Sequence, residues 1–353
     1  MPKTEKIEQN IALYRKYRPE TFEDVIGQDH IVKAIEGAFE SGKVAHAYLL
    51  SGPRGTGKTT IARIIARTLG SSVNDIYEMD AASNRKIEDA RDIRESVRTM
   101  PFDSKYKVYI LDEVHMLTKE AWNALLKTIE EPPAHVIFIL ATTELEKVPE
   151  TIVSRCQTFV FKKPTDAILA EVITRVAKKE GYTLAEGGAE LIALLASGAF
   201  RDALGTLQKV ISYSKDKKIT LKEIESVTGA PEASLVHSFL DALASSDIEK
   251  GYTAIRTASE QNIEMLIFLK MILAKLRYAL MLRYAPDSTT YLSEKISAGE
   301  LKYLQTLIST KPIHISSVSL SVLLDTYQSL RTSVIDELPL ELALIKILNG
   351  EEK

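Results

Sequence analysis

The chain has 353 residues, enough for two or three domains, and its 45% hydrophobic and 26% charged residues are typical of a globular protein in water. No apolar run reaches the length of a membrane span, and the first residues lack the apolar core of a secretory signal, so we expect a cytoplasmic protein without a membrane contact. The net charge of −3 gives no overall nucleic-acid signature, so any DNA contact would need a local basic patch.

The N-terminal segment is basic and aromatic. Residues 1–10 are polar and expected to fray. Arg18-Pro19 favours an extended arm and Gly27 a turn, so that this stretch, taken alone, indicates a surface loop. Apolar residues at helical spacing then predict a helix over residues 29–41.

The stretch Ser51–Thr60 fits the phosphate-binding loop pattern of glycine, four residues and Gly-Lys-Thr. Its glycines let consecutive backbone N–H groups turn toward phosphates, and the helix after it offers its positive N-terminal end. Residues 46–50 predict a buried strand before the loop, and residues 61–66 a helix after it. Lys58 would neutralise the outer phosphates, and the Thr59 hydroxyl would hold Mg²⁺. The predicted nucleoside triphosphate site contains Gly52, Pro53, Arg54, Gly55, Thr56, Gly57, Lys58, Thr59 and Thr60.

Residues 76–81 predict a second strand, and Ser83-Asn84 predict the cap of a helix from about Arg85 to Thr99. This helix interleaves basic and acidic side chains, a pattern that by itself is typical of a solvent-exposed face with i,i+4 ion pairs.

Residues 107–113 form an apolar run that ends in two carboxylates, as in a buried parallel strand that delivers acids to the rim of a sheet. Asp112 would orient Mg²⁺ through a water molecule, and Glu113 would polarise the attacking water. Downstream of a phosphate loop, the pair predicts hydrolysis as well as binding.

The remaining elements complete the predicted architecture. Residues 118–131 predict a helix with Trp122 in the core, and residues 136–143 and 157–161 predict two more strands. Strands alternating with helices indicate a doubly wound α/β domain with a parallel five-stranded sheet. Beyond Pro164 the pattern is helical, with helices over residues 166–180, 187–197, 201–214 and 220–229, a long apolar segment over 265–282, a break at 285–288 and a last helix over 338–348. A Thr220…Glu223 capping box opens the helix at 220–229.

The motifs occur in the order found in one family. The chain resembles the gamma/tau subunits of bacterial DNA polymerase III, the AAA+ ATPases of the sliding-clamp loader. The resemblance is carried by Tyr14–Pro19 with Phe22, Val25–Gln28, His46–Leu49, the phosphate loop, Asp80–Ser83, Asp112–Leu117, Asn123–Lys127, Glu130–Pro133, Ala141–Thr143, Ser154–Cys156 and Arg201–Leu204. It is dense over residues 13–210 and rests on helical character and length beyond them.

The resemblance implies an AAA+ nucleotide-binding domain over residues 1–165, a helical lid over 166–230 and a helical collar for oligomerisation over 231–353. It implies that ATP binding and hydrolysis, with Mg²⁺, open a sliding clamp and load it on primed DNA during replication. The implied partners are other loader subunits in a pentameric-type ring, the sliding clamp and the backbone of primer–template DNA.

The resemblance also assigns roles that spacing alone does not. Thr143 falls at the sensor 1 position, which registers the γ-phosphate or attacking water, and Arg201 falls at the sensor 2 position. Arg155 falls at the arginine finger, which would act on ATP bound by the neighbouring subunit. The expected catalytic set is therefore Lys58, Asp112, Glu113, Thr143, Arg155 and Arg201, and the matched N-terminal motifs add Arg18, Pro19, Val25 and Ile26 to the nucleotide-binding set.

The helix after Ser83 falls where clamp loaders track duplex phosphates, which makes Asn84, Arg85, Lys86 and Arg91 candidate DNA contacts. Such contacts would be independent of sequence and sensitive to salt. The alternative is a face whose acids pair with its bases.

One departure concerns zinc. Bacterial members usually insert a four-cysteine zinc module before the second strand, whereas here residues 69–75 connect the elements directly. Cys156 is the only cysteine, so no zinc is expected. This resembles the small subunits of archaeal and eukaryotic loaders, although Asp80–Ser83 and Ala141–Thr143 favour the bacterial type. The chain ends after the second helical block, as expected for a gamma-type form or a truncated tau-type protein.

Two other functions compete with clamp loading. A branch-migration AAA+ motor normally ends in a winged DNA-binding domain, whereas this C-terminal block indicates plain helices. A scaffold subunit that does not hydrolyse ATP typically lacks an intact phosphate loop, whereas this chain keeps Lys58, Thr59, Asp112 and Glu113.

Overall fold

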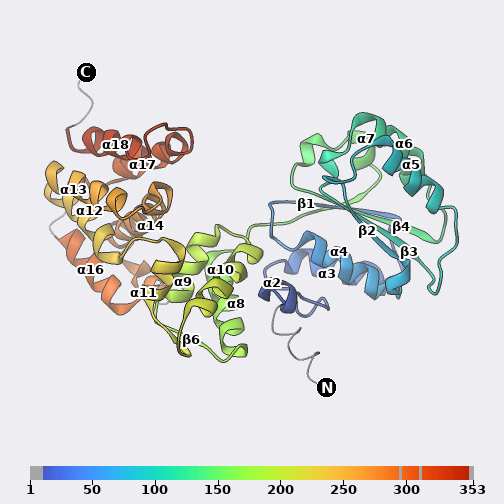
Figure 1. Ribbon diagram of the computed structural model, residues 1–353, viewed down its shortest axis with the longest axis horizontal. Helices are drawn as coiled ribbons and strands as arrows, with labels where there is room; N and C mark the ends of the chain where they lie inside the picture. Colours follow the sequence, from blue (N-terminus) through green and yellow to red (C-terminus); the bar gives the residue numbers. More distant parts are fainter. Residues whose placement is uncertain (1–10, 294–295, 310–311, 350–353) are drawn as a thin grey trace. The chain divides into compact units, whose positions relative to one another are not determined.

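The computed structural model describes residues 11–293, 296–309 and 312–349, so the segment expected to fray, residues 1–10, lies outside the described residues. The chain divides into two compact units (Figure 1). The first contains the described residues up to Ile168 together with Gly198–Gly205, and the second contains Leu169–Ser197 and the described residues from Thr206 onward. The finer boundaries after residues 165 and 230 stay predictions.

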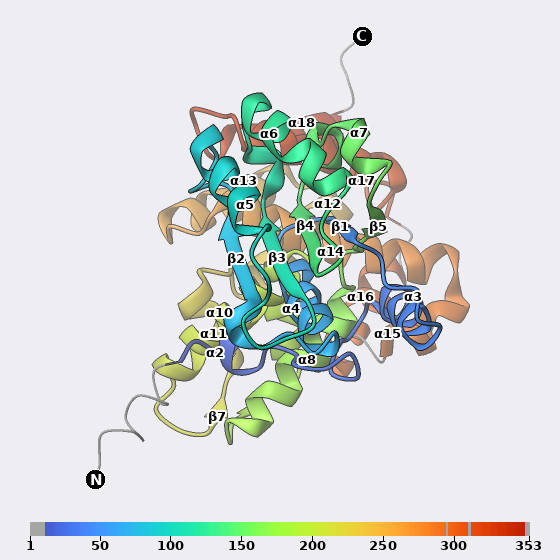
Figure 2. The ribbon, with the colours of Figure 1, turned by 90° about the vertical axis from the view of Figure 1, so that its right-hand side faces the viewer.

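The first unit is built on a parallel five-stranded sheet with the strand order β2-β3-β4-β1-β5 (Figure 2). The strands are β1 (Ala47–Ser51), β2 (Ile76–Asp80), β3 (Lys107–Asp112), β4 (Val136–Thr142) and β5 (Gln157–Val160). Long apolar runs form β1, β3 and β4 because these central strands are covered on both faces. The predicted fold class is confirmed.

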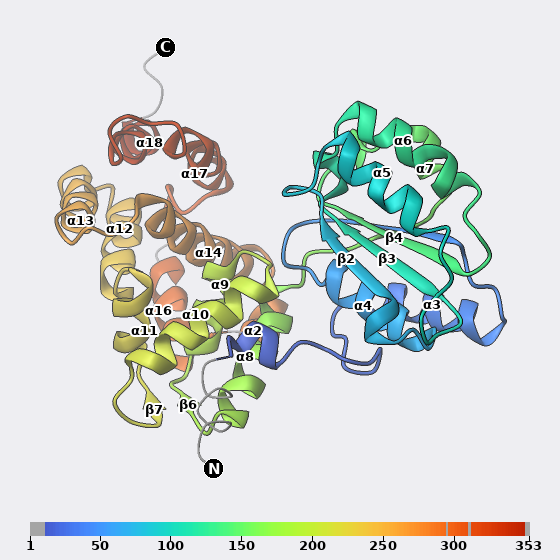
Figure 3. The same cartoon turned by 45° about the vertical axis from the view of Figure 1, so that its right-hand side comes forward.

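Helices cover both faces of this sheet (Figure 3). On one face lie α3 (Asp29–Glu40) and α4 (Lys58–Thr68), and on the other lie α5 (Ile87–Ser96), α6 (Lys119–Glu130) and α7 (Glu150–Val153). Because side chains alternate along a strand, Leu50 and Ile110 pack on the α3–α4 side, whereas Leu49 and Leu111 pack on the α5–α6 side. Trp122 is only 4% exposed in the α5–α6 core, which confirms its predicted structural role.

The N-terminal segment and the start of α5 differ from the predictions. A short helix, α2 (Leu13–Lys16), precedes Arg18 in the stretch predicted to be a loop. The predicted cap of α5 is wrong. The helix begins at Ile87, and the backbone N–H of Lys86 donates to the Asp89 carboxylate at 2.9 Å. Ser83 and Asn84 instead donate their backbone N–H groups to the Asp80 carbonyl, because the turn after β2 competes for them.

The connection between α4 and β2 is held by a buried carboxylate. It contains the short 3₁₀ helix η1 (Val73–Asp75), and two similar turns, η2 (Val114–Met116) and η3 (Leu145–Lys147), follow β3 and β4. Asp75 is fully buried and accepts backbone N–H groups from Phe102, Asp103 and Ser104 at 2.5, 2.9 and 2.9 Å. Burial opposes ionisation of Asp75, but these donors outweigh it and lower its pKa to about 2. The connection is therefore fastened to the loop before β3.

The second unit is helical, and one hydrophobic core in it consists of buried residues between Ala230 and Ile347. Its described helices are α8 (Asp166–Lys179) and α10 (Phe200–Tyr213), which both also reach into the first unit, α9 (Gly188–Ala196), α11 (Leu221–Thr228), α12 (Ala233–Ser245), α13 (Ile248–Glu260), α14 (Met265–Tyr284), η4 (Pro286–Ser288), α15 (Thr289–Ser293), α16 (Ala298–Ser309), α17 (Ser317–Leu330) and α18 (Leu338–Asn349). A two-residue parallel pair, β6 (Thr183–Leu184) and β7 (Lys218–Ile219), accompanies them. The predicted capping box is confirmed, since Glu223 accepts the N–H of Thr220 at 2.7 Å and returns its own N–H to the Thr220 hydroxyl at 3.3 Å. Among the described residues, no helix has the length and apolar character that a membrane span requires.

A buried polar cluster joins α12, α14 and α16 in this unit. Lys275 and Glu300 form an ion pair in which the side chains are 12% and 14% exposed. Nε2 of His237 lies 3.0 Å from the same carboxylate, and the His237 ring stacks on Tyr303 at 3.6 Å. The Tyr303 hydroxyl donates to Asp241 at 2.9 Å. The three helices are therefore held by specific polar contacts as well as by apolar packing.

Candidate nucleotide-binding and hydrolysis site

The loop between β1 and α4 requires glycine. Gly52 and Gly57 have φ angles of 146° and 105°, in the region that side chains with a Cβ rarely adopt. A Cβ on Gly52 would lie 2.6 Å from the Phe161 carbonyl oxygen and 2.8 Å from its Cβ. The loop thus passes so close to the end of β5 that only glycine fits at its first position.

Replacing Gly52 with alanine is expected to weaken ATP binding by the isolated chain at least about tenfold, because backbone strain of a few kcal/mol would move the loop. Equilibrium titration with a fluorescent ATP analogue measures the effect. The matched control is Gly37→Ala in α3, where a Cβ meets nothing within 4 Å and affinity should stay unchanged. Wild-type affinity of Gly52→Ala would show that the loop tolerates a side chain.

Lys58 is the first residue of α4, and its side chain turns back over the loop. It is 6% exposed, and its Nζ donates to the carbonyl oxygens of Gly52 and Pro53 at 2.7 and 3.0 Å. Burial lowers the pKa of Lys58, whereas the nearby charges of Glu113 and Asp112 oppose this shift. The loop therefore holds a buried cation at the lysine position of the phosphate-binding motif.

Thr59 and Asp112 meet where α4 begins and β3 ends. The Thr59 hydroxyl donates to Oδ2 of Asp112 at 2.6 Å. A hydroxyl oxygen beside a carboxylate is the type of donor set that Mg²⁺ prefers, so these two residues fit the predicted Mg²⁺ site.

Glu113 follows directly, with a left-handed backbone at φ 50°. Its backbone N–H donates to Asp112 at 2.9 Å, and its carboxylate accepts the Thr143 hydroxyl at 3.2 Å. The non-glycine residue in this unusual conformation is held by its neighbours, as is common at functional sites. The structure thus brings together Glu113 and Thr143, which come from two different strand ends.

His115 belongs to the same cluster and was given no role from the sequence. Its side chain is 7% exposed, and Nδ1 lies 3.1 Å from the Thr142 hydroxyl and 3.5 Å from the Glu113 carboxylate. Nε2 lies 3.3 Å from the carboxylate of Glu144. The only signal in the sequence was its position three residues after Asp112.

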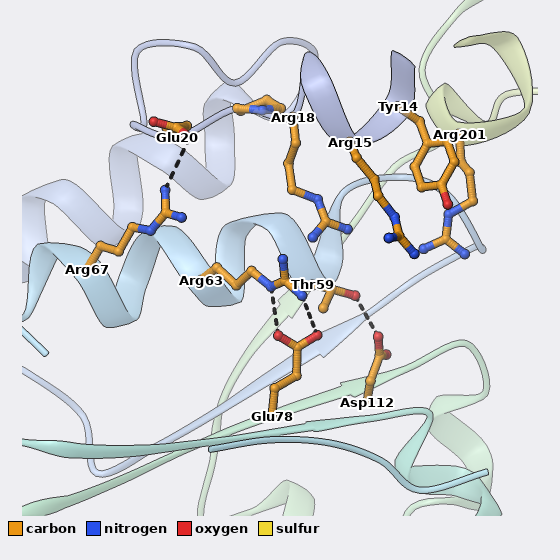
Figure 4. A pocket seen from close by; sticks show the side chains of 11 residues that line it. Tyr14, Arg15, Arg18, Glu20, Thr59, Arg63, Arg67, Glu78, Asp112 and Arg201 are labelled. Atoms are coloured by element: carbon orange, nitrogen blue, oxygen red, sulfur yellow. Dashed lines mark hydrogen bonds and ion pairs between the residues drawn. The ribbon is translucent and has the colours of Figure 1, made fainter. Parts of the chain in front are cut away.

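A cavity of about 520 Å³ lies beside Thr59 and Asp112 (Figure 4). Its lining contains Arg18, Pro19, Thr59, Asp112 and Arg201 from the predicted set, and Tyr14, Arg15, Glu20, Arg63, Arg67 and Glu78 in addition. The sequence held a signal for Arg63 and Arg67. They follow Thr59 at intervals of four residues, and all three therefore share one face of α4.

The cavity concentrates positive charge. Burial lowers the pKa of Arg18, the charge of Arg63 lowers it further, and Glu78 opposes the shift. Arg63 is held by two hydrogen bonds to Glu78, at 2.7 and 2.8 Å. The guanidinium of Arg201 lies 5.6 Å from the centre of the Tyr14 ring. Such a group of arginines suits a polyphosphate.

Arg201 reaches this cavity because the start of α10 packs on the phosphate loop. The backbone N–H of Phe200 donates to the Gly55 carbonyl at 3.0 Å. A Cβ on Gly55 would lie 2.8 Å from that of Ala199, so a second glycine permits close approach. Gly198–Gly205 belongs to the first unit, although the rest of α10 does not.

The candidate DNA-contacting residues lie on the surface. Arg85, Lys86 and Arg91 are exposed, and none of them forms a side-chain ion pair with another described residue, which argues against a self-paired face. Two backbone bonds attach their segment to the candidate hydrolysis site. Ala81 donates its N–H to the Asp112 carbonyl at 2.8 Å, and Thr118 donates its N–H to the Arg85 carbonyl at 3.2 Å.

Comparison with known proteins identifies the family. Residues 71–165 match the family model described as "DNA polymerase III, delta subunit", and residues 21–110 match that of "Magnesium chelatase, subunit ChlI". The DNA polymerase III subunit gamma of Buchnera aphidicola subsp. Schizaphis graminum is 37% identical, and the match covers 82% of this chain and 85% of that protein. The chain belongs to the gamma/tau family of DNA polymerase III subunits.

Other members of the gamma/tau family are longer. DNA polymerase III subunit tau of Bacillus subtilis is 36% identical over 95% of this chain and 63% of its own length. This chain spans 42% to 63% of the lengths of that protein and of two mycoplasma gamma/tau relatives. Among solved structures, the RuvB Holliday junction branch migration motor of Thermotoga maritima is 25% identical with a TM-score of 0.52, over 64% of this chain and 79% of that one.

Not every predicted residue of this gamma/tau-family chain lies in the cavity. The wall contains Thr59 but no other residue of the phosphate loop, and it also lacks Val25, Ile26, Glu113, Thr143 and Arg155. Val25 packs against the α3–α4 core. Arg155 follows α7, and its guanidinium lies 3.1 Å from a carboxylate oxygen of Glu130. The roles assigned to these residues, like those of the other predicted site residues, stay predictions.

Proposed function

We propose that this chain is an ATP-hydrolysing subunit of the DNA polymerase III clamp loader, which uses ATP to open the sliding clamp and load it on primed DNA in the cytoplasm. The match to a gamma subunit over most of both chains carries this proposal. The phosphate loop with Lys58, Thr59 and Asp112 supports the ATPase part.

The proposed chemistry is attack of water on the γ-phosphorus of ATP. The new oxygen–phosphorus bond forms as the bond to the ADP oxygen breaks, and Glu113 accepts the proton that the water loses. Thr143 orients Glu113 through its hydroxyl, and Lys58 and Arg201 stabilise negative charge on the phosphates. Mg²⁺, when held by Thr59 and by Asp112 through water, supplies further positive charge there. No zinc takes part in this proposal.

Partner contacts complete the proposed site. In a ring with other loader subunits, Arg155 acts on ATP bound by the neighbouring subunit. The exposed cations Arg85, Lys86 and Arg91, together with Asn84, contact phosphates of the primer–template duplex inside the ring.

ATP turnover of the reconstituted loader tests the function, with and without sliding clamp and primed DNA. We expect clamp and primed DNA together to raise turnover above that of the loader alone, since DNA would align Arg155 with the neighbour's ATP. Turnover that is indifferent to both partners would contradict the proposal.

A branch-migration motor is the second candidate, favoured by the structural similarity to RuvB. Stimulation by four-way junctions instead of primed ends would support it.

For a scaffold subunit, the decisive observation would be clamp loading by a complex that carries Lys58→Ala.

A further inference from the structure

The last turn of α6 contacts the residue that we propose as the arginine finger. Nε of Arg155 lies 3.1 Å from Oε1 of Glu130, and the two side chains are 41% and 28% exposed. One further nitrogen, Nη1, donates to the Thr151 carbonyl at 2.7 Å and to the Ser154 hydroxyl at 3.3 Å. Within the described residues, none of these bonds uses Nη2. Two of the three guanidinium nitrogens are therefore held by oxygens of the same chain, whereas Nη2 takes part in none of these contacts.

The backbone that supports this contact is fixed on both sides. Glu130 is the last residue of α6, so its backbone is held by the helix. The backbone carbonyls at this end carry partial negative charge, and the Glu130 carboxylate is therefore stabilised by the nearby Arg155 cation. Arg155 precedes Cys156, whose side chain packs against the α5–α6 core of the sheet. Two anchored elements thus set the position of the guanidinium.

We propose that Glu130 is a positioning residue for Arg155: it holds the guanidinium so that Nη2 is presented to a phosphate of ATP bound by the adjacent subunit. The proposal rests on the proposed function of Arg155. An arginine side chain loses much rotamer freedom when it binds, and part of this ordering is already achieved by the contacts to Glu130 and Thr151. Because an exposed ion pair is weak, it orders the side chain without preventing a further bond to phosphate.

Steady-state ATP turnover of the reconstituted loader, with clamp and primed DNA, tests this proposal. Glu130→Ala is expected to lower kcat about threefold to tenfold, the effect of losing the order of one long side chain, with KM unchanged. Glu130→Gln keeps an oxygen acceptor for Nε and is expected to retain most of the activity. Glu131→Ala, which removes the exposed carboxylate one residue further on, is the matched control and should behave as wild type.

The double variant distinguishes positioning from a general structural effect. In an Arg155→Ala background, Glu130→Ala should cause no additional loss, because its effect acts through Arg155. The proposal would be overturned by equal losses in both backgrounds or by a wild-type kcat for Glu130→Ala. A raised kcat for Glu130→Ala would also overturn it, because it would show that Glu130 holds Arg155 away from its phosphate. If Arg155→Ala alone leaves turnover unchanged, the proposed role of Arg155 fails and this inference fails with it. A loss in Arg155→Ala without one in Glu130→Ala sinks only the inference.

Discussion

Arg155→Ala is expected to lower ATP turnover of the assembled complex by about 10³-fold or more, the range known for arginine fingers. The physical reason is that the guanidinium stabilises charge that develops on the transferred phosphoryl group, and a shorter side chain leaves that charge uncompensated. The residue lies outside the cavity of its own chain. ATP affinity of the isolated chain should therefore stay within about twofold of wild type, since exposed substitutions away from a site rarely exceed a few tenths of a kcal/mol.

Two measurements keep this prediction specific. Arg155→Lys retains the charge but not the planar fork and should also lose most turnover. Arg175→Ala removes an exposed arginine from α8 and should leave turnover unchanged. Full turnover in Arg155→Ala would show that each site of the ring is complete in one chain.

Glu300→Ala is expected to lower the free energy of unfolding of the second unit by about 3 kcal/mol, because it leaves the ammonium of Lys275 buried without its carboxylate. This value is the lower end of the range for breaking a buried ion pair. Burial lowers the pKa of Lys275, so in the variant Lys275 can lose its proton instead of remaining charged without a partner. Burial alone would raise the pKa of Glu300, but the hydrogen bond to His237 and the charge of Lys275 hold it below its usual value. The contribution is therefore complete at pH 7 and is lost as pH falls through this lowered pKa.

Urea unfolding at pH 7 measures this effect through helical circular dichroism, where a shift of about 1 M in the midpoint is expected. Trp122, the only tryptophan, lies in the first unit, so its fluorescence follows the other transition separately. Lys250→Ala is the control, because the pair of Lys250 with Asp241 is about 40% exposed on both sides and is worth at most about 1 kcal/mol. An unchanged midpoint for Glu300→Ala would show that the cluster adds little to stability.

The fold was predictable where the sequence pattern is determined by burial. The three central strands are apolar throughout because helices cover both faces, and the strand boundaries agree within one or two residues. The start of α5 was not predictable. Ser83 and Asn84 are residue types that favour helix caps, but their backbone N–H groups bind the Asp80 carbonyl in the turn after β2.

The same contrast holds for the candidate site. Lys58, Thr59 and Asp112 were predictable because phosphate and Mg²⁺ chemistry requires these residue types at fixed spacing. The contacts of Arg63 and His115 were not predictable, although Arg63 shares a helix face with Thr59, because their partners Glu78, Glu113 and Glu144 are brought beside them only when separate elements pack together. The motif therefore predicts the residues expected to bind phosphate and Mg²⁺, whereas the other residues of the cavity wall are brought together only by the tertiary structure.

The bonds from Ala81 to Asp112 and from Thr118 to Arg85 close a ring of backbone. One side of this ring carries Arg85, on the surface proposed to meet DNA, and the other side carries Asp112 at the candidate hydrolysis site. The segment from Ala81 to Arg85 is fastened at one end to the end of β3 and at the other to Thr118, the N-cap of α6, so a displacement of Arg85 would act on both elements. In the proposed function, the DNA contact and the hydrolysis site are therefore only a few peptide units apart along this ring of backbone.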